Sequence, residues 1–231
     1  MHSHRIAELL HPFLSAPLND QQLTDISTYI DILLRWNARM NLTAVREPEK
    51  IVTRHFGESL FAAGHLFSPP KLHDATVGEA RPPKPSTAFD RSADAHSIQL
   101  IDVGSGAGFP GIPIKIYAPQ THITLIESNQ KKATFLREVT RALTLTDVNV
   151  FAGRAEDFQA AGDIVTLRAV ERFQDALPIA ARLVSPVGRL ALLIGQRQID
   201  RLPDLVPTFH WSEPLPVPLS ENRVLVIGQQ D

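Results

Sequence analysis

The chain has 231 residues, of which 43% are hydrophobic and 21% charged, and its formal net charge is −2. This length suits one α/β domain with an N-terminal extension and is short for two independent domains. The chain has no cysteine, which excludes disulfides, thiolate zinc sites and cysteine nucleophiles. No apolar run reaches the length of a membrane span, and the first residues lack the apolar segment of a signal peptide. We therefore expect a cytoplasmic protein with no membrane partner.

The first part of the chain predicts helices. Residues 3–15 carry apolar residues at helical spacing, and a second helix follows from a capping box that opens at Asn19. Pro48 suits the first turn of a third helix. We predict an N-terminal helical extension over residues 1–67 that packs on a catalytic domain.

Residues 68–97 differ from the rest in composition. Prolines are scattered there among small and charged residues, with almost no periodic apolar pattern. This predicts a disordered linker or insertion that leads into the catalytic domain, which we place over residues 98–231.

From residue 98 onward, short apolar runs alternate with helical patterns. The runs at 98–102, 122–126, 148–150, 163–167 and 189–194 predict strands, and 114–118, 129–143 and 175–183 predict helices. Two last apolar runs, over 209–227, predict an antiparallel pair of strands. The alternation favours a Rossmann-like, mostly parallel α/β sheet with helices on both faces.

A glycine-rich turn follows the first of these strands directly. It contains Gly104, Gly106, Gly108 and Gly111. Glycine lets the chain turn sharply and lets backbone N–H groups approach a ligand that a Cβ atom would keep away. A buried strand that runs into such a turn and then a helix is typical of a nucleotide-cofactor site.

Three other residues fall at or just after the predicted carboxyl ends of strands: Glu127, Glu156 and Arg168. In open α/β sheets, ligands bind outside the carboxyl ends of the strands. The sequence therefore predicts that these side chains meet Gly104 at one edge of the sheet and form a site there.

Two cofactors compete for this site. Residues 106–111 match the G-x-G-x-x-G pattern of dinucleotide-binding proteins, whereas 102–108 match the acidic-x-G-x-G-x-G pattern of S-adenosylmethionine-dependent methyltransferases. Glu127 suits the ribose hydroxyls of either ligand. Pro110 and Pro113 remove two N–H donors that a pyrophosphate needs at a helix N-terminus. We favour S-adenosylmethionine and a class I methyltransferase sheet with an antiparallel C-terminal strand, and we keep an NAD(P)-dependent oxidoreductase as the alternative.

Several short motifs carry a resemblance to one family. They are Trp36-Asn37, Asn41-Leu42-Thr43, Arg54-His55, the glycine motif over 102–113, Lys131-Lys132, Phe135-Leu136, Arg154-Ala155-Glu156 and Arg168-Ala169. Together they resemble the bacterial ribosomal RNA small-subunit methyltransferase G family, also called glucose-inhibited division protein B. The resemblance covers about residues 36–67 and 98–195, and it implies N7 methylation of one guanine of 16S rRNA with S-adenosylmethionine as the methyl donor.

The resemblance also implies roles for individual residues. Gly104 and Phe109 would contact the cofactor from the first loop, beside Gly106. Ala155 and Glu156 would hold its adenine side. Arg168 would line the place where cofactor and base meet, as a positioning group. No general base is required, because the N7 lone pair of guanine attacks without first losing a proton.

The chain departs from the family pattern at several positions. Residues 68–97 form an apparent insertion, and Glu58 stands where an aspartate is usual. Leu167 replaces a serine, and Ile194 replaces a lysine. The loss of that lysine puts in doubt any substrate contact that it makes in relatives, but not cofactor binding.

Local basic faces are the candidates for contact with 16S rRNA or the small ribosomal subunit, since a negative total charge does not exclude RNA binding. The RNA-binding candidates are Arg35, Arg39, Arg46, Lys131, Lys132 and Arg137, with Arg154 and Arg172 nearer the sheet. The alternatives are that these residues are ordinary solvated helix faces, that the substrate is a small molecule, or that the chain is a non-catalytic RNA-binding module. The histidines lack the spacing of metal ligands, so we assign no metal, and we expect a monomer.

Overall fold

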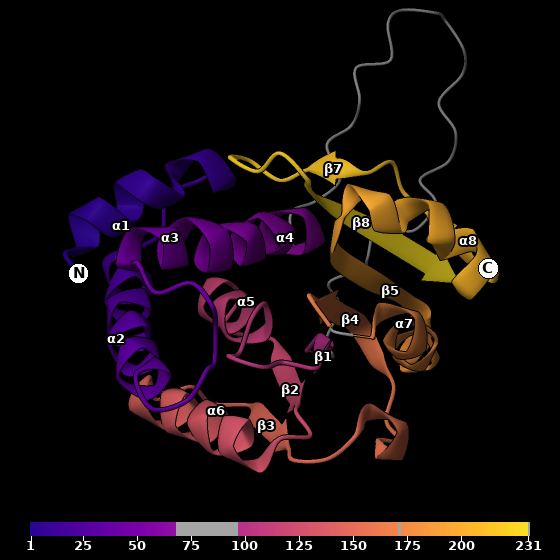
Figure 1. Cartoon of the computed structure of the whole chain (residues 1–231), viewed down its shortest axis with the longest axis horizontal. Helices are drawn as coiled ribbons and strands as arrows, with labels where there is room; N and C mark the ends of the chain where they lie inside the picture. The colour runs from indigo at the N-terminus through magenta and orange to yellow at the C-terminus, as the bar shows by residue number, and fades with distance from the viewer. Residues whose placement is uncertain (68–96, 171, 231) are drawn as a thin grey trace, which may run out of the picture.

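The computed structural model describes residues 1–67, 97–170 and 172–230 (Figure 1). All of the predicted linker except residue 97 lies outside these ranges. The centre of the molecule is an eight-stranded sheet in the order β3-β2-β1-β4-β5-β8-β6, with β7 paired to β8. No helix within the described residues is long and apolar enough to cross a membrane.

The strands confirm the predicted sheet. Their bounds are β1 Gln99–Val103, β2 His122–Ile126, β3 Val148–Phe151, β4 Gly162–Arg168, β5 Val184–Gly195, β6 Phe209–Trp211, β7 Leu215–Pro216 and β8 Arg223–Gln230. The first five strands are parallel, and β8 is antiparallel to β5, β6 and β7. The predicted C-terminal pair is β6 and β8, and β8 lies between β5 and β6 in the sheet.

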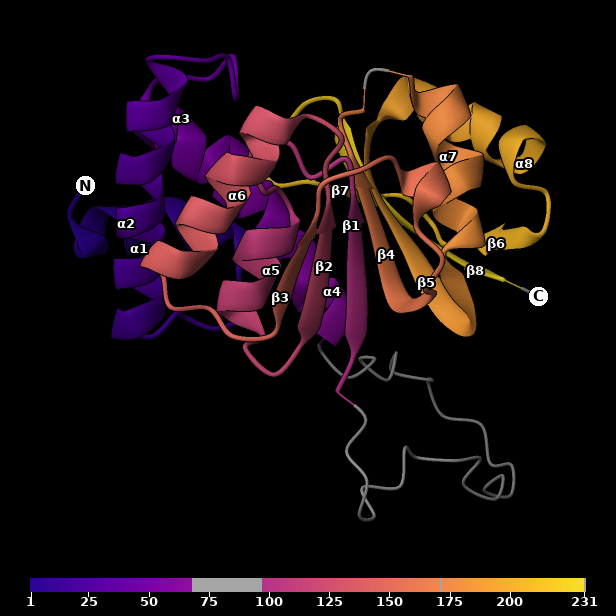
Figure 2. The same ribbon diagram turned by 90° about the horizontal axis from the view of Figure 1, so that it is seen from below.

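The helices lie on both faces of the sheet (Figure 2). One face carries α1 Ser3–Leu10, the 3-10 turn His11–Phe13, α2 Asp20–Asn37, α3 Pro48–Ile51, the π-helical segment Val52–Gly57, α4 Glu58–Phe67, α5 Gly111–Tyr117 and α6 Gln130–Ala142. The other carries the 3-10 turn Ala155–Asp157 (η3), α7 Phe173–Arg182, the 3-10 helix Gln196–Arg201 (η4) and α8 Leu202–Leu205. The sequence did not predict η4 and α8.

Two hydrophobic cores follow from this arrangement. The N-terminal helices, α5 and α6 share one core, in which Ile30 and Leu33 of α2 pack with Leu136 of α6. Leu177 of α7 and Leu202 of α8 belong to the core on the opposite face. The helical extension therefore supplies much of the cover for one face of the sheet.

The starts of the N-terminal helices match the prediction. Asn19 Oδ1 accepts a hydrogen bond from Gln22 N at 2.9 Å, and Asn19 N donates to Gln22 Oε1 at 2.9 Å, so the capping box is complete. The third helix begins at Pro48 and continues through the π-helical segment into α4. His55 of that segment and Glu58, the first residue of α4, are both buried.

Candidate cofactor site

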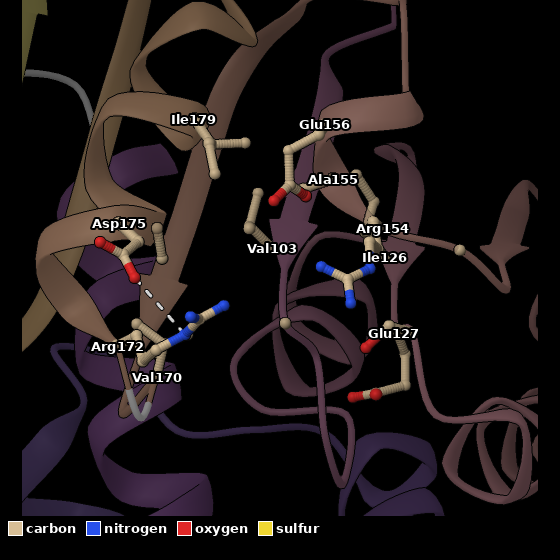
Figure 3. Close-up of a pocket in the computed structure, with 14 residues that line it drawn as sticks. Val103, Ile126, Glu127, Arg154, Ala155, Glu156, Val170, Arg172, Asp175 and Ile179 are labelled. Carbon is tan, nitrogen blue, oxygen red and sulfur yellow. Dashed lines mark ion pairs between the residues drawn. The ribbon is translucent and has the colours of Figure 1, made fainter.

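The carboxyl ends of β1, β2, β3 and β4 meet at a cavity of about 280 Å³ (Figure 3). It is lined by Val103, Gly104, Ile126, Glu127, Ser128, Gly153, Arg154, Ala155, Glu156, Val170, Arg172, Asp175, Ala176 and Ile179. From β1 the chain crosses to β2 on one side, and from β4 it crosses to β5 on the other. Such a switch point in strand order is where open α/β sheets bind ligands.

The first half of the glycine turn brings backbone to this cavity. Gly104 and Gly106 have φ angles of +68° and +56°, in the left-handed region that glycine adopts without strain. Gly104 lines the cavity, and a Cβ atom there would lie 3.1 Å from Val170 Cγ1. Gly106 does not line it, but its N–H donates to Glu127 Oε2 at 2.9 Å. Gly106 therefore acts on the cavity through Glu127.

Glu127 is held in place by backbone donors. Its Oε1 accepts from Asn129 N at 2.7 Å, while Oε2 accepts from Gly106, and the residue is buried at the end of β2. Each carboxylate oxygen can accept more than one hydrogen bond, so the group keeps acceptor capacity toward the cavity. A fixed carboxylate of this kind suits a pair of ribose hydroxyls. Glu156, on η3, gives the same cavity a second carboxylate.

Apolar side chains form much of the remaining wall. Val103 and Ile126 end β1 and β2, Ala155 begins η3, and Val170 and Ile179 come from the β4–α7 side. Flat heterocycles bind between such surfaces, with a few polar groups fixing their orientation. An adenosine needs acceptors for its ribose hydroxyls and apolar walls for its base. The carboxylates and apolar side chains of this cavity supply both, so the cavity fits S-adenosylmethionine.

The second half of the glycine motif faces protein. A Cβ atom at Gly108 would overlap Ile112 Cδ1 at 2.7 Å, and one at Gly111 would overlap Leu125 Cδ2 at 2.5 Å. Gly111 N, at the start of α5, donates to Asp102 Oδ2 at 3.3 Å, and no residue of α5 lines the cavity. A dinucleotide pyrophosphate would need those N–H groups free at the helix N-terminus. The geometry therefore disfavours the dinucleotide alternative.

Phe109 lies behind the turn and does not line the cavity. Its ring stacks on Tyr29 of α2 at a centroid distance of 5.3 Å and an interplanar angle of 6°, and on His55 at 4.9 Å. Tyr29 is fully buried, and its hydroxyl donates to Ala107 O in the glycine turn. The resemblance implied a cofactor contact for Phe109; in the structure this ring instead ties the turn to the N-terminal helices.

Removing the Tyr29 hydroxyl tests this attachment. We expect Tyr29→Phe to lower the free energy of unfolding by about 1–2 kcal/mol, because the buried Ala107 carbonyl loses its donor. Affinity for S-adenosylhomocysteine should fall as well, since the turn then samples other positions. Urea denaturation and calorimetry measure the two effects. Tyr117→Phe is the matched control, and equal behaviour of the two variants would contradict the role of Tyr29.

Arg168, at the end of β4, also lies outside the cavity lining. Its Nε and Nη2 donate to Glu58 Oε2 at 3.2 and 2.9 Å, and Nη2 also donates to Arg54 O at 2.9 Å. Arg223 Nη2 lies 3.5 Å from the same Glu58 oxygen. Arg168, the site residue inferred from the resemblance, therefore belongs to a cluster with Arg223 around the buried Glu58, between the sheet and α4.

His55 completes this cluster as a neutral group. Burial, with the nearby Arg168 charge, lowers the pKa of His55 from 6.5 to about 3. Arg168 Nη2 lies 3.0 Å from Nδ1, and Thr43 Oγ1 lies 2.7 Å from Nε2. Because guanidinium only donates, Nδ1 accepts and Nε2 carries the proton, which it donates to Thr43. His55 is thus an uncharged imidazole that joins Arg168 to Thr43 through hydrogen bonds.

Asp102 lies beneath the glycine turn with its carboxyl group fully buried. Thr166 Oγ1 donates to its Oδ1 at 2.7 Å. Burial raises the pKa of Asp102 from 3.8 to about 6, although the hydrogen bonds from Thr166 and Gly111 favour the charged form. The folded chain therefore keeps a proton here that the unfolded chain releases. The resulting stability is complete below about pH 4 and is lost as the pH rises through about 6.

A pH series on Asp102→Asn checks this sign. We expect the unfolding free energy of wild type minus that of the variant to fall by about 3 kcal/mol between about pH 4 and pH 7. His55 acts in the opposite direction, since a lowered pKa costs stability as the pH falls below 6.5. Both chains contain His55, so its contribution cancels in the difference. Urea denaturation gives each value, and a difference independent of pH would show that Asp102 ionises normally.

Comparison with known proteins assigns the chain to a family. The model of the family described as rRNA small subunit methyltransferase G matches residues 22–74 and 86–213. The chain belongs to this family. The match confirms the resemblance predicted from the sequence, and with it S-adenosylmethionine as the cofactor of an rRNA methyltransferase.

Curated members of the rRNA small subunit methyltransferase G family are similar over most of the chain. The protein of that name from Streptococcus uberis is 36% identical, covering 81% of this chain and 71% of its own length. The Xanthomonas campestris protein is 35% identical, covering 88% and 84%. The Chloroflexus aggregans protein is 33% identical, covering 91% and 83%.

Solved structures show the same fold. Magnesium protoporphyrin IX methyltransferase from Synechocystis, with bound S-adenosylmethionine, has a TM-score of 0.50 at 11% identity and covers 58% of this chain and 71% of its own. An O-methyltransferase family protein from Burkholderia thailandensis has a TM-score of 0.50 at 17% identity, covering 59% and 52%. These likenesses support the class I methyltransferase fold.

The structure gathers four of the seven predicted cofactor residues at the cavity: Gly104, Glu127, Ala155 and Glu156. Gly106, Phe109 and Arg168 do not line the cavity, and Gly106 contacts it through its hydrogen bond to Glu127. Sequence reasoning missed Asp175 and Ile179, which α7 brings to the cavity. Their position could have indicated this role. They lie on the helix that follows β4, and that helix has to begin at the edge of the sheet where Gly104 lies.

Proposed function

We propose that the chain transfers the methyl group of S-adenosylmethionine to N7 of a guanine in 16S rRNA. The observation that carries the proposal is the cavity at the switch point, where Glu127 and Glu156 face apolar walls suited to an adenosine. Membership of the rRNA small subunit methyltransferase G family supports rRNA as the substrate. The small ribosomal subunit, or an intermediate of its assembly, is the partner that we propose, for a chain that acts as a monomer in the cytoplasm.

The chain's own residues bind and orient in this scheme. Glu127 would accept hydrogen bonds from the ribose hydroxyls, the Gly104 backbone would leave room for the methionine arm, and Val103, Ile126 and Ala155 would hold the adenine. The cofactor, when bound, would supply an electrophilic methyl group, whose bond to sulfur breaks as the bond to N7 forms, so that S-adenosylhomocysteine leaves. Guanine N7 is an acceptor with a free lone pair, so no residue has to remove a proton before attack. Positioning of N7 in line with the methyl group is the main catalytic task.

The basic residues predicted to contact RNA lie near this edge of the sheet. Lys131 and Lys132 lie in the first turn of α6, and Arg39 and Arg46 lie in the connection between α2 and α3. Figure 2 shows both segments at the edge where the parallel strands end. Arg35 is in the last turn of α2, and Arg137 Nη2 donates to Val150 O at 3.3 Å. All are exposed except the half-buried Lys132. This placement supports, for the set, a role in holding rRNA beside the cavity.

The test is methyl transfer to defined RNA. Purified protein is incubated with labelled S-adenosylmethionine and either small-subunit particles or naked 16S rRNA from cells that lack the gene, and the labelled nucleotide is mapped. We expect label on N7 of a single guanine. If S-adenosylhomocysteine binds but no RNA is labelled, the RNA substrate is wrong and a small-molecule methyltransferase is favoured. If neither binding nor transfer occurs, the cofactor site itself is wrong.

A further inference from the structure

A second depression adjoins the cofactor cavity on the α7 side of the sheet. It has a volume of about 570 Å³, and its lining includes Arg172, Arg197 and Arg201. Arg172 and Asp175 line both this depression and the cofactor cavity, so the two spaces share a wall. We call this depression the arginine groove.

The groove has an excess of positive charge. Among the described residues that line it, Asp175 is the acidic one, and its Oδ2 lies 3.4 Å from Arg172 Nε in an exposed ion pair. Arg197 and Arg201 are exposed, and neither forms an ion pair or side-chain hydrogen bond with another residue in the described part of the chain. Two guanidinium groups therefore remain available for an anionic ligand.

The fold places these arginines from two separate segments. Arg172 precedes the first turn of α7, and Arg197 and Arg201 lie four residues apart on η4, which follows β5. Gln198 Oε1 accepts from Gly195 N at 3.0 Å and so fixes η4 at the end of the strand. The positive N-terminal end of α7 borders the groove through Phe173 and Gln174. Guanidinium groups arranged along an open groove match successive phosphates better than a single small anion.

We propose that the arginine groove binds the sugar–phosphate backbone of the rRNA nucleotides next to the target base. This inference rests on the proposed rRNA substrate and extends it to a surface that the sequence did not select, since Arg197 and Arg201 were not among the predicted RNA contacts. A target base that meets the methyl group at the mouth of the occupied cofactor cavity leaves its flanking phosphates outside. On the α7 side, Arg172 and Asp175 separate the cavity from the groove, so phosphates next to the base on this side would lie in the groove.

The experiment uses the full chain with the two unpaired guanidinium groups removed, as the double variant Arg197→Gln and Arg201→Gln. The matched control is Arg141→Gln with Arg182→Gln, which removes two exposed charges from the last turns of α6 and α7, at the opposite edge of the sheet. Binding of unmethylated 16S rRNA is measured over a range of salt concentrations, together with the KM for rRNA and the affinity for S-adenosylhomocysteine.

We expect the groove variant to raise the KM for rRNA about tenfold, with unchanged S-adenosylhomocysteine affinity. The slope of log affinity against log salt should become shallower by about 1.4, because each lost phosphate contact on a single strand accounts for about 0.7. The control variant should behave as wild type. An unchanged KM and slope in the groove variant would overturn the proposal, as would a raised KM with an unchanged slope. Failure of the wild-type chain to methylate any rRNA would instead refute the proposed function.

Discussion

Replacing Glu58 by alanine is expected to lower the free energy of unfolding by about 3–5 kcal/mol. The Glu58 side chain is only 4% exposed, and its carboxylate accepts from Arg168 at 2.9 Å, while Arg223 lies 3.5 Å away. Its removal would leave the Arg168 and Arg223 guanidinium groups, of which Arg168 is nearly buried, without the carboxylate that both approach. A buried charge that loses its partner costs far more than the intact pair contributes.

Comparison with a surface pair separates this effect from the general loss of an ion pair. Glu49→Ala breaks the pair between Glu49 and Arg5, which joins at 2.8 Å with both side chains about half exposed. We expect no measurable change in stability there, because solvent screens exposed charges. Urea denaturation at neutral pH measures both variants. Comparable small effects for Glu58→Ala and Glu49→Ala would show that water reaches the cluster and that its burial is not maintained in solution.

Glu58→Gln sharpens the result further. Glutamine preserves the volume and one acceptor oxygen but removes the charge that balances Arg168 and Arg223. An intermediate loss of stability would assign part of the effect to packing and the remainder to charge. The family resemblance places an aspartate at this position, and the longer side chain of Glu58 reaches Arg168 and Arg223 from α4 in this chain.

The general architecture could be predicted from the sequence because its signals are local. Buried parallel strands are short apolar runs, and their alternation with helical patterns fixes a sheet whose carboxyl ends share one edge. That rule alone brought Gly104, Glu127 and Glu156 to one cavity. The segments η4 and α8 were missed because a few residues of 3-10 helix and a single short helix leave no periodic pattern to detect.

The direction in which the Arg168 side chain points could not be predicted from the sequence. The rule that places residues at the edge of a sheet does not say toward which face a side chain points, and successive residues of a strand alternate between faces. Leu167 packs in the core beneath α7, whereas Arg168, one residue later, points to His55 and Glu58. The cofactor cavity opens on the side of Val103 and Ile126, which belong to the α7 core.

The same limit applies to Phe109 and Ile194. Phe109 packs against Tyr29, a partner 80 positions away that only the docking of α2 brings near. Ile194 is 2% exposed in the α7 core. The family resemblance places a lysine at this position, but in this chain the residue packs in the core. The positive charges near this end of β5 are those of Arg197 and Arg201. Such exchanges depend on tertiary neighbours that no local pattern records.

Cofactor binding should depend most strongly on Glu127. We expect Glu127→Ala to weaken the binding of S-adenosylmethionine by about 100-fold, since hydrogen bonds to a charged group contribute about 1.5–3 kcal/mol. Two effects combine in this variant. The ribose hydroxyls lose their acceptor, and Gly106 N and Asn129 N lose the carboxylate that fixes the glycine turn against β2. Calorimetry with S-adenosylhomocysteine measures the loss without depending on any RNA.

Two neighbouring acids on η3 make the comparison specific. Glu156 lines the cavity but is exposed, so we expect Glu156→Ala to weaken binding by about tenfold. Asp157 is also exposed but does not line the cavity, so Asp157→Ala should bind as wild type. If all three variants bind equally well, the adenosine does not lie against these acids. If Asp157→Ala alone weakens binding, the cofactor lies on the outer side of η3, because that is the side from which Asp157 can be reached.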